Sequence, residues 1–355
     1  MELKNFGGTK LEKSGKKPKV AVLMGGIGSE RQVSIQSGTS VANALKQAGF
    51  EVVEADITPD NLGIIEDKNI DIFFPALHGE FGEDGQLQQI LEDKTLLYTG
   101  SGPQASRTAF DKIESKKLFS KAGVSTPKSI EFDDNTEIEQ LLELGDKYVI
   151  KPVREGSSVG VCIVSSPKDA FEEAQKTLAE FGDCMIEEFI EGREITVGIL
   201  CDEPLPIIEI KAQSGFYNYH AKYVDEQTQY LFDTIGDPNI AASIIQAAID
   251  CYEALGCQHF ARVDFILSNE NIPYALEINT IPGFTSHSLL PKAAAKAGFS
   301  MSDLCEKIIE TAKFSENVTR LRSSLRSTLN VRRNELRNRT PLGVPRTTID
   351  ERGQV

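Results

Sequence analysis

The sequence lacks the features typical of a membrane protein, a disulfide scaffold or a repeat array. No apolar run reaches the roughly 18 residues that spanning a bilayer requires, and the N-terminal stretch has no apolar segment like that of a signal peptide. The 6 cysteines contain no CxxC pair, and no repeat occurs at solenoid periods. We therefore expect a cytoplasmic globular protein with buried free thiols and no metal cluster.

Two common nucleotide-binding motifs are also missing. Gly26 and Gly28 begin a GxGxxG pattern, but Arg31 stands where the third glycine is needed. No GxxxxGK[ST] motif occurs. The sequence therefore supports neither a dinucleotide-dependent enzyme nor a Walker-type NTPase.

The chain length and the net charge further limit the kinds of protein that this sequence can encode. A chain of 355 residues exceeds what one compact core usually spans, so we expect two or three packed subdomains. The net charge is −15, but residues 1–19 carry +4 and residues 314–355 carry +5, which leaves −24 on residues 20–313. Such an acidic body repels nucleic acid on average, so a nucleic-acid partner is not expected. To bind an anionic small substrate, this acidic body would need local clusters of basic side chains, and a divalent cation would assist such binding.

Hydrophobic patterning predicts a mixed fold. The first hundred residues alternate strands and helices, which is typical of a parallel sheet covered by helices. Later strands, such as KYVIKP and VGVCIV, are close enough in sequence to pair as hairpins, and a helix is predicted from Phe110 to Ala122. The predicted fold class is thus α/β in the N-terminal part and α+β beyond it.

The segment GSSVG at residues 156–160 matches the GxSxG motif of serine hydrolases. Ser158, Asp264 and His287 even follow the hydrolase order of nucleophile, acid and base. A nucleophile elbow requires a helix directly after the serine, whereas here strand-like alternation follows Gly160. The serines are therefore predicted at a hairpin tip, where backbone N–H groups and hydroxyls suit phosphate oxygens; a plain mobile turn is the alternative.

Three oxygen-bearing side chains lie in the predicted hairpin HFARVDFILSNENIPYALEINTIPG. A turn centred between Glu270 and Asn271 pairs Asp264 with Glu277 and Arg262 with Asn279, and places Leu276 on the opposite face. Two carboxylates directly opposite each other repel unless a proton, a cation or water lies between them. Two carboxylates and an amide oxygen suit Mg²⁺, so the hairpin predicts a nucleotide-metal site; an ordinary solvated face is the alternative.

Two lysines extend the nucleotide interpretation. Lys151 ends the strand YVIK, and Lys112 follows Asp111 at a predicted helix start. Fixed ammonium groups at these points would reach phosphates, although either lysine taken alone is more typical of a solvated surface.

Together these residues and their flanking stretches resemble the D-alanine–D-alanine ligases of the ATP-grasp fold, from about Lys19 to Lys313. The matching stretches are SERQVS, ALHGEFGEDG, YTGSGP, KPVREGSSVGV, EEFIEGREITVGIL, YHAKY, ARVDF and LEINTIPGFTSHSLLP. The resemblance implies an N-terminal parallel α/β subdomain at 19–105, a central ATP-grasp lid at 106–195 and a C-terminal subdomain with the metal site at 196–313. Basic extensions flank them at 1–18 and 314–355, and a homodimer is implied.

The resemblance also implies the reaction and the nucleotide site. ATP would phosphorylate one D-alanine carboxylate, and the amine of a second D-alanine would then displace phosphate, yielding a peptidoglycan precursor. Asp264, Glu277 and Asn279 would hold Mg²⁺ as cofactor, with Mn²⁺ as the alternative. The residues implied to bind ATP are Lys112, Lys151, Glu155, Glu187, Phe189, Ile190, Glu194 and Lys222.

The resemblance assigns the amino-acid substrates to a second group. Glu30 would bind the ammonium of the first D-alanine, linked to Ser157 or Ser158 and to Tyr223. Arg262 and the Gly283 N–H would stabilise the oxyanion. His78 would lie beside the substrate carboxylate, and Ser288 with the Leu289 backbone would hold the carboxylate of the second D-alanine.

Other functions are also compatible with parts of the sequence. A ligase of the same fold using D-lactate or D-serine as second substrate is the nearest alternative. A serine hydrolase and a non-catalytic nucleotide sensor belong to different classes, although the presence of both Glu30 and Arg262 argues against the sensor. The C-terminal tail is either a basic amphipathic helix or a solvated extension.

Overall fold

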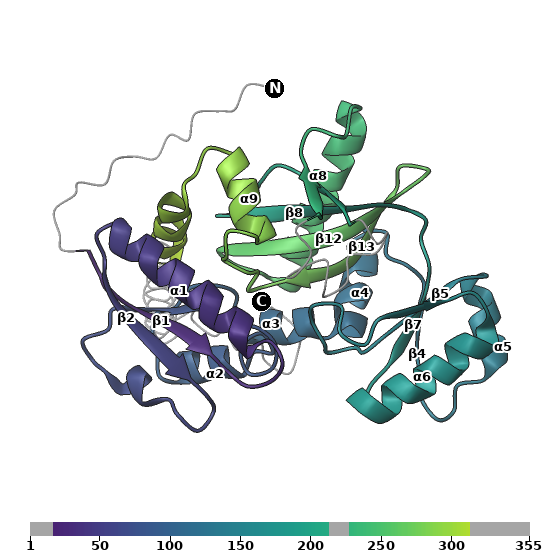
Figure 1. Ribbon diagram of the computed structural model, residues 1–355, viewed down its shortest axis with the longest axis horizontal. Helices are drawn as coiled ribbons and strands as arrows, with labels where there is room; N and C mark the ends of the chain where they lie inside the picture. Colours follow the sequence, from purple (N-terminus) through teal and green to yellow (C-terminus); the bar gives the residue numbers. More distant parts are fainter. Residues whose placement is uncertain (1–16, 213–226, 313–355) are drawn as a thin grey trace, which may run out of the picture. The chain divides into compact units, whose positions relative to one another are not determined.

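The computed structural model describes residues 17–212 and 227–312, which all belong to the first of two compact units, Met1–Ala312. The described residues form three sheets with helices packed against them (Figure 1). Mixed α/β and α+β architecture is therefore confirmed. Of the 6 cysteines, all in the described part, four are buried and two, Cys162 and Cys201, are half-buried.

The N-terminal sheet is parallel, as the alternating pattern predicted. Its strand order is β2-β1-β3, and the buried run Val20–Leu23 lies in the central strand. Helix α1 packs closely on β1 because Gly38 has no side chain: a Cβ there would lie 2.5 Å from the Met24 side chain. The elements are β1 Lys19–Gly25, α1 Arg31–Gln47, β2 Glu51–Ile57, η1 Gly63–Glu66, β3 Ile72–Pro75 and α2 Gln86–Asp93.

The second sheet is antiparallel, with strand order β4-β7-β5-β6. Helix α6 packs against it, and its ends follow local chemistry: Ser166 accepts from the Asp169 N–H, Pro167 occupies the first turn, and Gly182 ends the helix in the left-handed conformation. The elements are β4 Ser129–Glu131, α5 Ile138–Leu141, η2 Leu142–Leu144, β5 Tyr148–Lys151, β6 Cys162–Val164, α6 Pro167–Phe181 and β7 Met185–Glu188.

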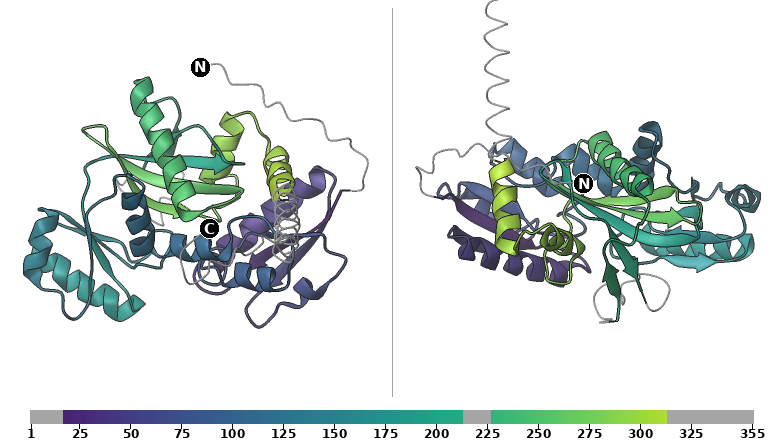
Figure 2. Two further views of the ribbon diagram at one scale, coloured as in Figure 1. Left: turned by 180° about the vertical axis from the view of Figure 1, so that it is seen from behind. Right: turned by 90° about the horizontal axis from the view of Figure 1, so that it is seen from above.

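The third sheet has six strands in the order β11-β10-β8-β12-β13, with β9 paired to β8. Helices α3, α4 and α8 share one apolar cluster with this sheet, and residues 301–312 form a helix beside α1 (Figure 2). The elements are β8 Gly192–Leu200, β9 Glu203–Pro204, β10 Ile208–Lys211, β11 Gln229–Leu231, α8 Pro238–Leu255, β12 Phe260–Ser268, β13 Pro273–Asn279, α9 Leu289–Lys296, α3 Pro103–Phe110 and α4 Lys112–Lys121.

The sequence also predicted the position of one helix and one subdomain boundary. The helix predicted from Phe110 to Ala122 is confirmed within two residues as α4, because the carboxylate of Asp111 accepts from the Ile113 and Glu114 N–H groups and starts the helix at Lys112. The short helix α3 before it was not predicted. The predicted boundary at residue 195 falls inside β8. The division into subdomains stays a prediction.

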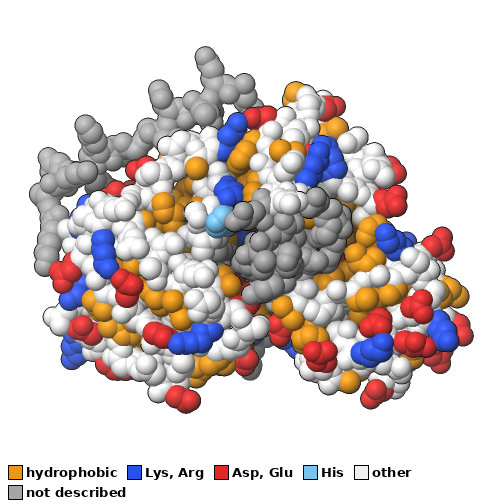
Figure 3. All heavy atoms as spheres, viewed as in Figure 1, with side chains coloured by type: hydrophobic (Ala, Val, Ile, Leu, Met, Phe, Trp, Pro, Cys, Tyr) orange, Lys and Arg blue, Asp and Glu red, His pale blue; other side chains and the backbone are white. Residues whose placement is uncertain are grey.

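Charged side chains are mixed on the surface. On the face in Figure 3, acidic and basic groups of the described residues are interspersed rather than gathered by sign.

Three fully buried phenylalanines connect the first and third sheets. Phe74 of β3, Phe260 of β12 and Phe284 after β13 have ring centroids 5.5 to 6.2 Å apart and belong to one cluster. Aromatic pairs in such edge-on and stacked arrangements add to the free energy of burial. This contact fixes the segment after β13 beside the N-terminal sheet.

We predict that Phe260→Ala lowers the free energy of unfolding by about 3–5 kcal/mol, because it removes a ring and leaves a cavity. Chemical denaturation measures the change. Leu142→Ala is the control, since Leu142 is 62% exposed and its loss should change stability by only about 0.5 kcal/mol. Equal effects of the two substitutions would contradict the assignment.

Candidate active site

The β12–β13 hairpin brings the predicted carboxylates face to face. Asp264 pairs with Glu277 and Arg262 with Asn279, which confirms the predicted register at these positions. The register then shifts at a β-bulge, so Phe265 pairs with Ala275. The prediction that Leu276 lies on the face opposite Glu277 is wrong: the bulge turns both side chains toward the same cavity.

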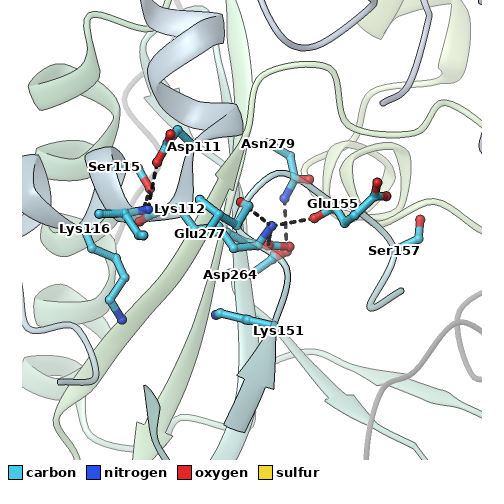
Figure 4. Close-up of polar contacts among 12 residues, drawn as sticks. Asp111, Lys112, Ser115, Lys116, Lys151, Glu155, Ser157, Asp264, Glu277 and Asn279 are labelled. Atoms are coloured by element: carbon cyan, nitrogen blue, oxygen red, sulfur yellow. Dashed lines mark hydrogen bonds and ion pairs between the residues drawn. The ribbon is translucent and has the colours of Figure 1, made fainter. Parts of the chain in front are cut away.

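Asp264 is the most heavily hydrogen-bonded acid of this face. Its carboxylate accepts from Thr196 Oγ1 at 2.6 Å, from Arg262 at 2.9 and 2.7 Å, and from the Asn279 amide at 3.2 Å. Figure 4 shows the contact between Asn279 and Asp264. The bidentate contact with the Arg262 guanidinium orients the carboxylate strongly. Arg262 thus compensates one of the two opposed negative charges, and Lys112 Nζ lies 3.8 Å from the other, on Glu277.

The donor set matches a hard divalent cation. Asp264, Glu277 and Asn279 provide two carboxylates and an amide, and Mg²⁺ usually completes its shell with water and phosphate oxygens. Within residues 17–212 and 227–312, no group of three or more His, Cys, Asp or Glu side chains forms a metal site. A cation here would therefore depend on oxygen atoms supplied by a ligand.

Two lysines form ion pairs with a buried glutamate beside this face, and a third lies nearby. Glu187 of β7 is 2% exposed and forms ion pairs with Lys116 of α4 and with Lys151 of β5, the latter at 2.7 Å. Burial alone would raise the pKa of Glu187, but the charges of Lys151 and Lys116 more than offset this effect and lower it. Lys112 donates to the backbone carbonyls of Val153 and Glu155, and burial lowers its pKa.

A cavity of about 460 Å³ extends from these charges between the second and third sheets. One side is apolar and includes Phe189 and Ile190, while Glu194 lies at its edge on β8. A slot with apolar walls and a cationic end fits a planar base that carries phosphates. The predicted nucleotide residues that line this cavity are Lys112, Lys151, Glu155, Glu187, Phe189, Ile190 and Glu194.

A second cavity of about 80 Å³ adjoins the first, and Glu277 lines both. The predicted substrate and oxyanion residues that line it are Glu30, His78, Ser157, Arg262, Gly283, Ser288 and Leu289. A Cβ on Gly283 would lie 2.6 Å from Ser288 Oγ, so a side chain there would displace this hydroxyl from its hydrogen bond with the Thr285 N–H. Ser288 also precedes α9, whose N-terminal N–H groups favour a carboxylate.

The Gly-Ser segment reaches across to the N-terminal subdomain. Ser157 Oγ donates to Glu30 Oε1 at 2.5 Å, which joins two predicted residues that are 127 positions apart. Ser157 and Ser158 both have positive φ, 52° and 60°, at the tip of the β5–β6 hairpin. Because strand β6 follows instead of a helix, the serine-hydrolase alternative lacks its required strand–turn–helix.

His78 lies in a buried network that the sequence did not reveal. Its Nε2 is 3.0 Å from Ser37 Oγ, which also accepts from the Phe284 N–H, and Glu83 lies 4.0 Å from Nδ1. The last distance describes an ion pair rather than a hydrogen bond. Burial alone would lower the pKa of His78, but its interactions with Glu83 and the charge of Glu30 raise it overall.

Other residues of the site were missed or lie outside the described part. Lys116, Glu83 and Thr196 were not singled out from the sequence; only Lys116 carried a signal, its spacing of one helical turn from Lys112. Lys222 and Tyr223 lie outside the described residues, so their predicted roles stay predictions.

Comparison with known proteins agrees with this geometry. The family models for the D-ala D-ala ligase N-terminus and C-terminus match residues 61–101 and 119–310. A D-alanine–D-alanine ligase from Syntrophotalea carbinolica is 40% identical over 83% of this chain and 96% of the relative. The chain belongs to the D-alanine–D-alanine ligase family.

Solved structures of the family share the ATP-grasp fold predicted for this ligase-family chain. A D-alanine–D-alanine ligase from Bacillus anthracis complexed with ATP has a TM-score of 0.72 and 34% identity, covering 84% of this chain and 98% of that one. The VanG D-Ala:D-Ser ligase from Enterococcus faecalis has a TM-score of 0.73 and 29% identity, covering 84% and 100%. No described helix is long and apolar enough to cross a membrane.

We predict that Glu83→Gln lowers the pKa of His78 relative to the wild type, because burial, which lowers this pKa, is then opposed by fewer groups that raise it. NMR titration of the histidine ring protons measures this change, with Glu80→Gln as the control at an exposed neighbour.

The same substitution changes the pH dependence of stability. A pKa raised in the folded state contributes stability that is fully present below pH 6.5 and is lost as the pH rises through the folded-state value. The advantage of the wild type over Glu83→Gln should therefore be largest at low pH and shrink as pH increases. An unchanged His78 titration in the variant would contradict this assignment.

Proposed function

We propose that the protein is an ATP-dependent ligase that joins two D-alanines into D-alanyl-D-alanine, a precursor for peptidoglycan. The observation that carries the proposal is Glu277, which lines both the 460 Å³ cavity with its lysines and the adjoining 80 Å³ cavity with Glu30 and Arg262. A reaction that transfers phosphate from a nucleotide to a small substrate requires two such sites in contact.

The first step activates a carboxylate. Glu30 binds the ammonium of the first D-alanine. The carboxylate of this D-alanine then lies toward Arg262 and the Gly283 N–H. A carboxylate oxygen attacks the γ-phosphorus of ATP while the bond to the β-phosphate oxygen breaks, which yields D-alanyl phosphate and ADP. Lys112 and Lys151 compensate the phosphate charge, with Lys222 as a further predicted contact.

The second step forms the peptide bond. Ser288 and the N-terminus of α9 bind the carboxylate of the second D-alanine, as the resemblance implies. Its ammonium loses a proton, and the resulting amine attacks the carbonyl carbon to give a tetrahedral intermediate, whose oxyanion Arg262 and Gly283 stabilise. The nitrogen then loses a second proton, which the departing phosphate can accept as the bond from carbon to the phosphate oxygen breaks. The hydrogen-bonded pair Glu30–Ser157, extended by Tyr223, is the proposed acceptor of the first proton.

Asp264, Glu277 and Asn279 are the proposed Mg²⁺ ligands, and Mn²⁺ is an acceptable substitute for such an oxygen set. The bound ion would neutralise phosphate charge and orient the phosphate chain. The homodimer implied by the resemblance and the cytoplasmic location inferred from the sequence stay predictions.

Product analysis tests the function. With ATP, Mg²⁺ and D-alanine, we expect ADP release that depends on all three, and a product with the mass of the dipeptide. Competition with D-serine and D-lactate at several pH values identifies the second substrate. ADP release at the same rate with and without D-alanine would refute the proposal. Labelling of Ser158 by a fluorophosphonate would also refute it.

We predict that Glu277→Gln lowers kcat about a hundredfold, because it weakens a metal ligand and removes a charge at the junction of the two cavities. The free energy of unfolding should change by only about 1 kcal/mol, since the volume is preserved and the side chain is half-buried. Glu203→Gln, exposed on the same sheet, is the matched control. Wild-type ADP production by Glu277→Gln would remove this residue from the metal site.

A further inference from the structure

Lys116 is a buried cation that has no place in the proposed reaction. It lies on α4 one turn after Lys112, and its side chain is 5% exposed. Lys112 lines the nucleotide cavity, whereas Lys116 lines neither this cavity nor the smaller substrate cavity. In Figure 4 its side chain extends away from Asp264 and Glu277. A buried ammonium without ligand contact requires another reason for its charge.

Its partner is the buried carboxylate of the nucleotide cavity. Lys116 donates to Oε1 of Glu187, and Lys151 forms its ion pair with Oε2 at 2.7 Å. One carboxylate oxygen of Glu187 therefore contacts Lys151, which lines the nucleotide cavity, and the other contacts Lys116, which does not. Burial raises the pKa of Glu187, and the charges of both lysines oppose this effect and lower it overall.

Nucleotide binding changes this balance. In the proposed function, the phosphates of ATP attract Lys151, which is then shared with or withdrawn from Glu187. Leaving a buried carboxylate without a compensating cation is strongly unfavourable. Lys116 cannot reach the cavity, so it stays with Glu187 and lowers the free energy needed to release Lys151 to the phosphates.

We propose that Lys116 is a positioning residue, which holds Glu187 in place as a hydrogen-bond acceptor for the nucleotide base and frees Lys151 for the phosphates. This inference rests on the proposed use of ATP. An ionised carboxylate accepts hydrogen bonds but donates none. Adenine presents an exocyclic amino donor where guanine presents a carbonyl acceptor, so a fixed Glu187 carboxylate favours adenine. Lys116 therefore contributes both to ATP affinity and to base selectivity.

The test compares nucleotide binding by Lys116→Met and Lys116→Arg with that of the wild type. Calorimetric titration with Mg-ADP and Mg-GDP gives affinities without turnover, and steady-state kinetics give KM for ATP and GTP. We expect Lys116→Met to weaken adenine-nucleotide binding about 10- to 100-fold, to raise KM more than it lowers kcat, and to reduce the preference for adenine over guanine about tenfold. Lys116→Arg should recover most of each property.

Lys117→Met is the matched control, because Lys117 is the next residue of α4, is 62% exposed and forms only a surface ion pair with Glu114. Its affinities and selectivity should equal those of the wild type.

A double-mutant cycle covers the case in which Lys116→Met folds poorly. If Lys116 acts through Glu187, adding Lys116→Met to Glu187→Gln should change ADP affinity less than twofold, because the charge that Lys116 compensates is already gone. If the losses of ADP affinity caused by Lys116→Met and by Glu187→Gln were additive in the double variant, the proposal would be overturned. A Lys116→Met variant that has lower stability but wild-type affinity and wild-type selectivity would overturn it as well.

The outcomes also separate this inference from the proposed function. A wild-type protein that binds ADP but makes no dipeptide would refute the ligase activity, while the titrations would still decide the role of Lys116. A wild-type protein that makes the dipeptide, with Lys116→Met unchanged in affinity and selectivity, would refute only the role of Lys116.

Discussion

Asp264 and Glu277 lie directly opposite each other on paired strands, and the neighbouring groups compensate this repulsion between like charges. Arg262 on the same strand makes a bidentate contact with Asp264, while Lys112 approaches Glu277 from α4. In the part of the chain that the structure describes, the face carries two carboxylates and no third one, so phosphate oxygens of a ligand would have to complete the shell of a bound divalent cation. The proposed chemistry depends on this arrangement.

Helix α4 connects this face to the nucleotide cavity. Asp111 caps the helix, which places Lys112 in its first turn beside Glu277, and Lys116 one turn later beside Glu187. A single helix thus supplies cations to two carboxylates on different sheets. Since α4 packs in the same apolar cluster as α8 and the third sheet, the positions of both ammonium groups depend on that core.

Much of the site was predictable from short stretches of sequence. The pairing of Asp264 with Glu277 follows from strand alternation and the position of a turn, and it was predicted correctly. The bulge that turns Leu276 into the cavity was not, because the backbone irregularity depends on how both strands pack, and alternation assumes a regular pleat. The start of α4 was predicted, since Asp111 bonds the N–H groups that follow it, whereas the separate short helix α3 was not.

Local pattern, charge sequence and turn residues determined the strands and helices, the hairpin that bears the acids and the hairpin tip that bears Ser157, because these features involve residues close together along the chain. The contact of Ser157 with Glu30, the sharing of Glu187 between Lys116 and Lys151, and the proximity of His78 to Ser37 and Glu83 were decided only by the tertiary structure. Most of these contacts join residues from 36 to 127 positions apart, which come together only when the chain folds and distant elements pack. The energy of a buried ion pair depends on that packing, since burial sets how strongly each charge needs its partner.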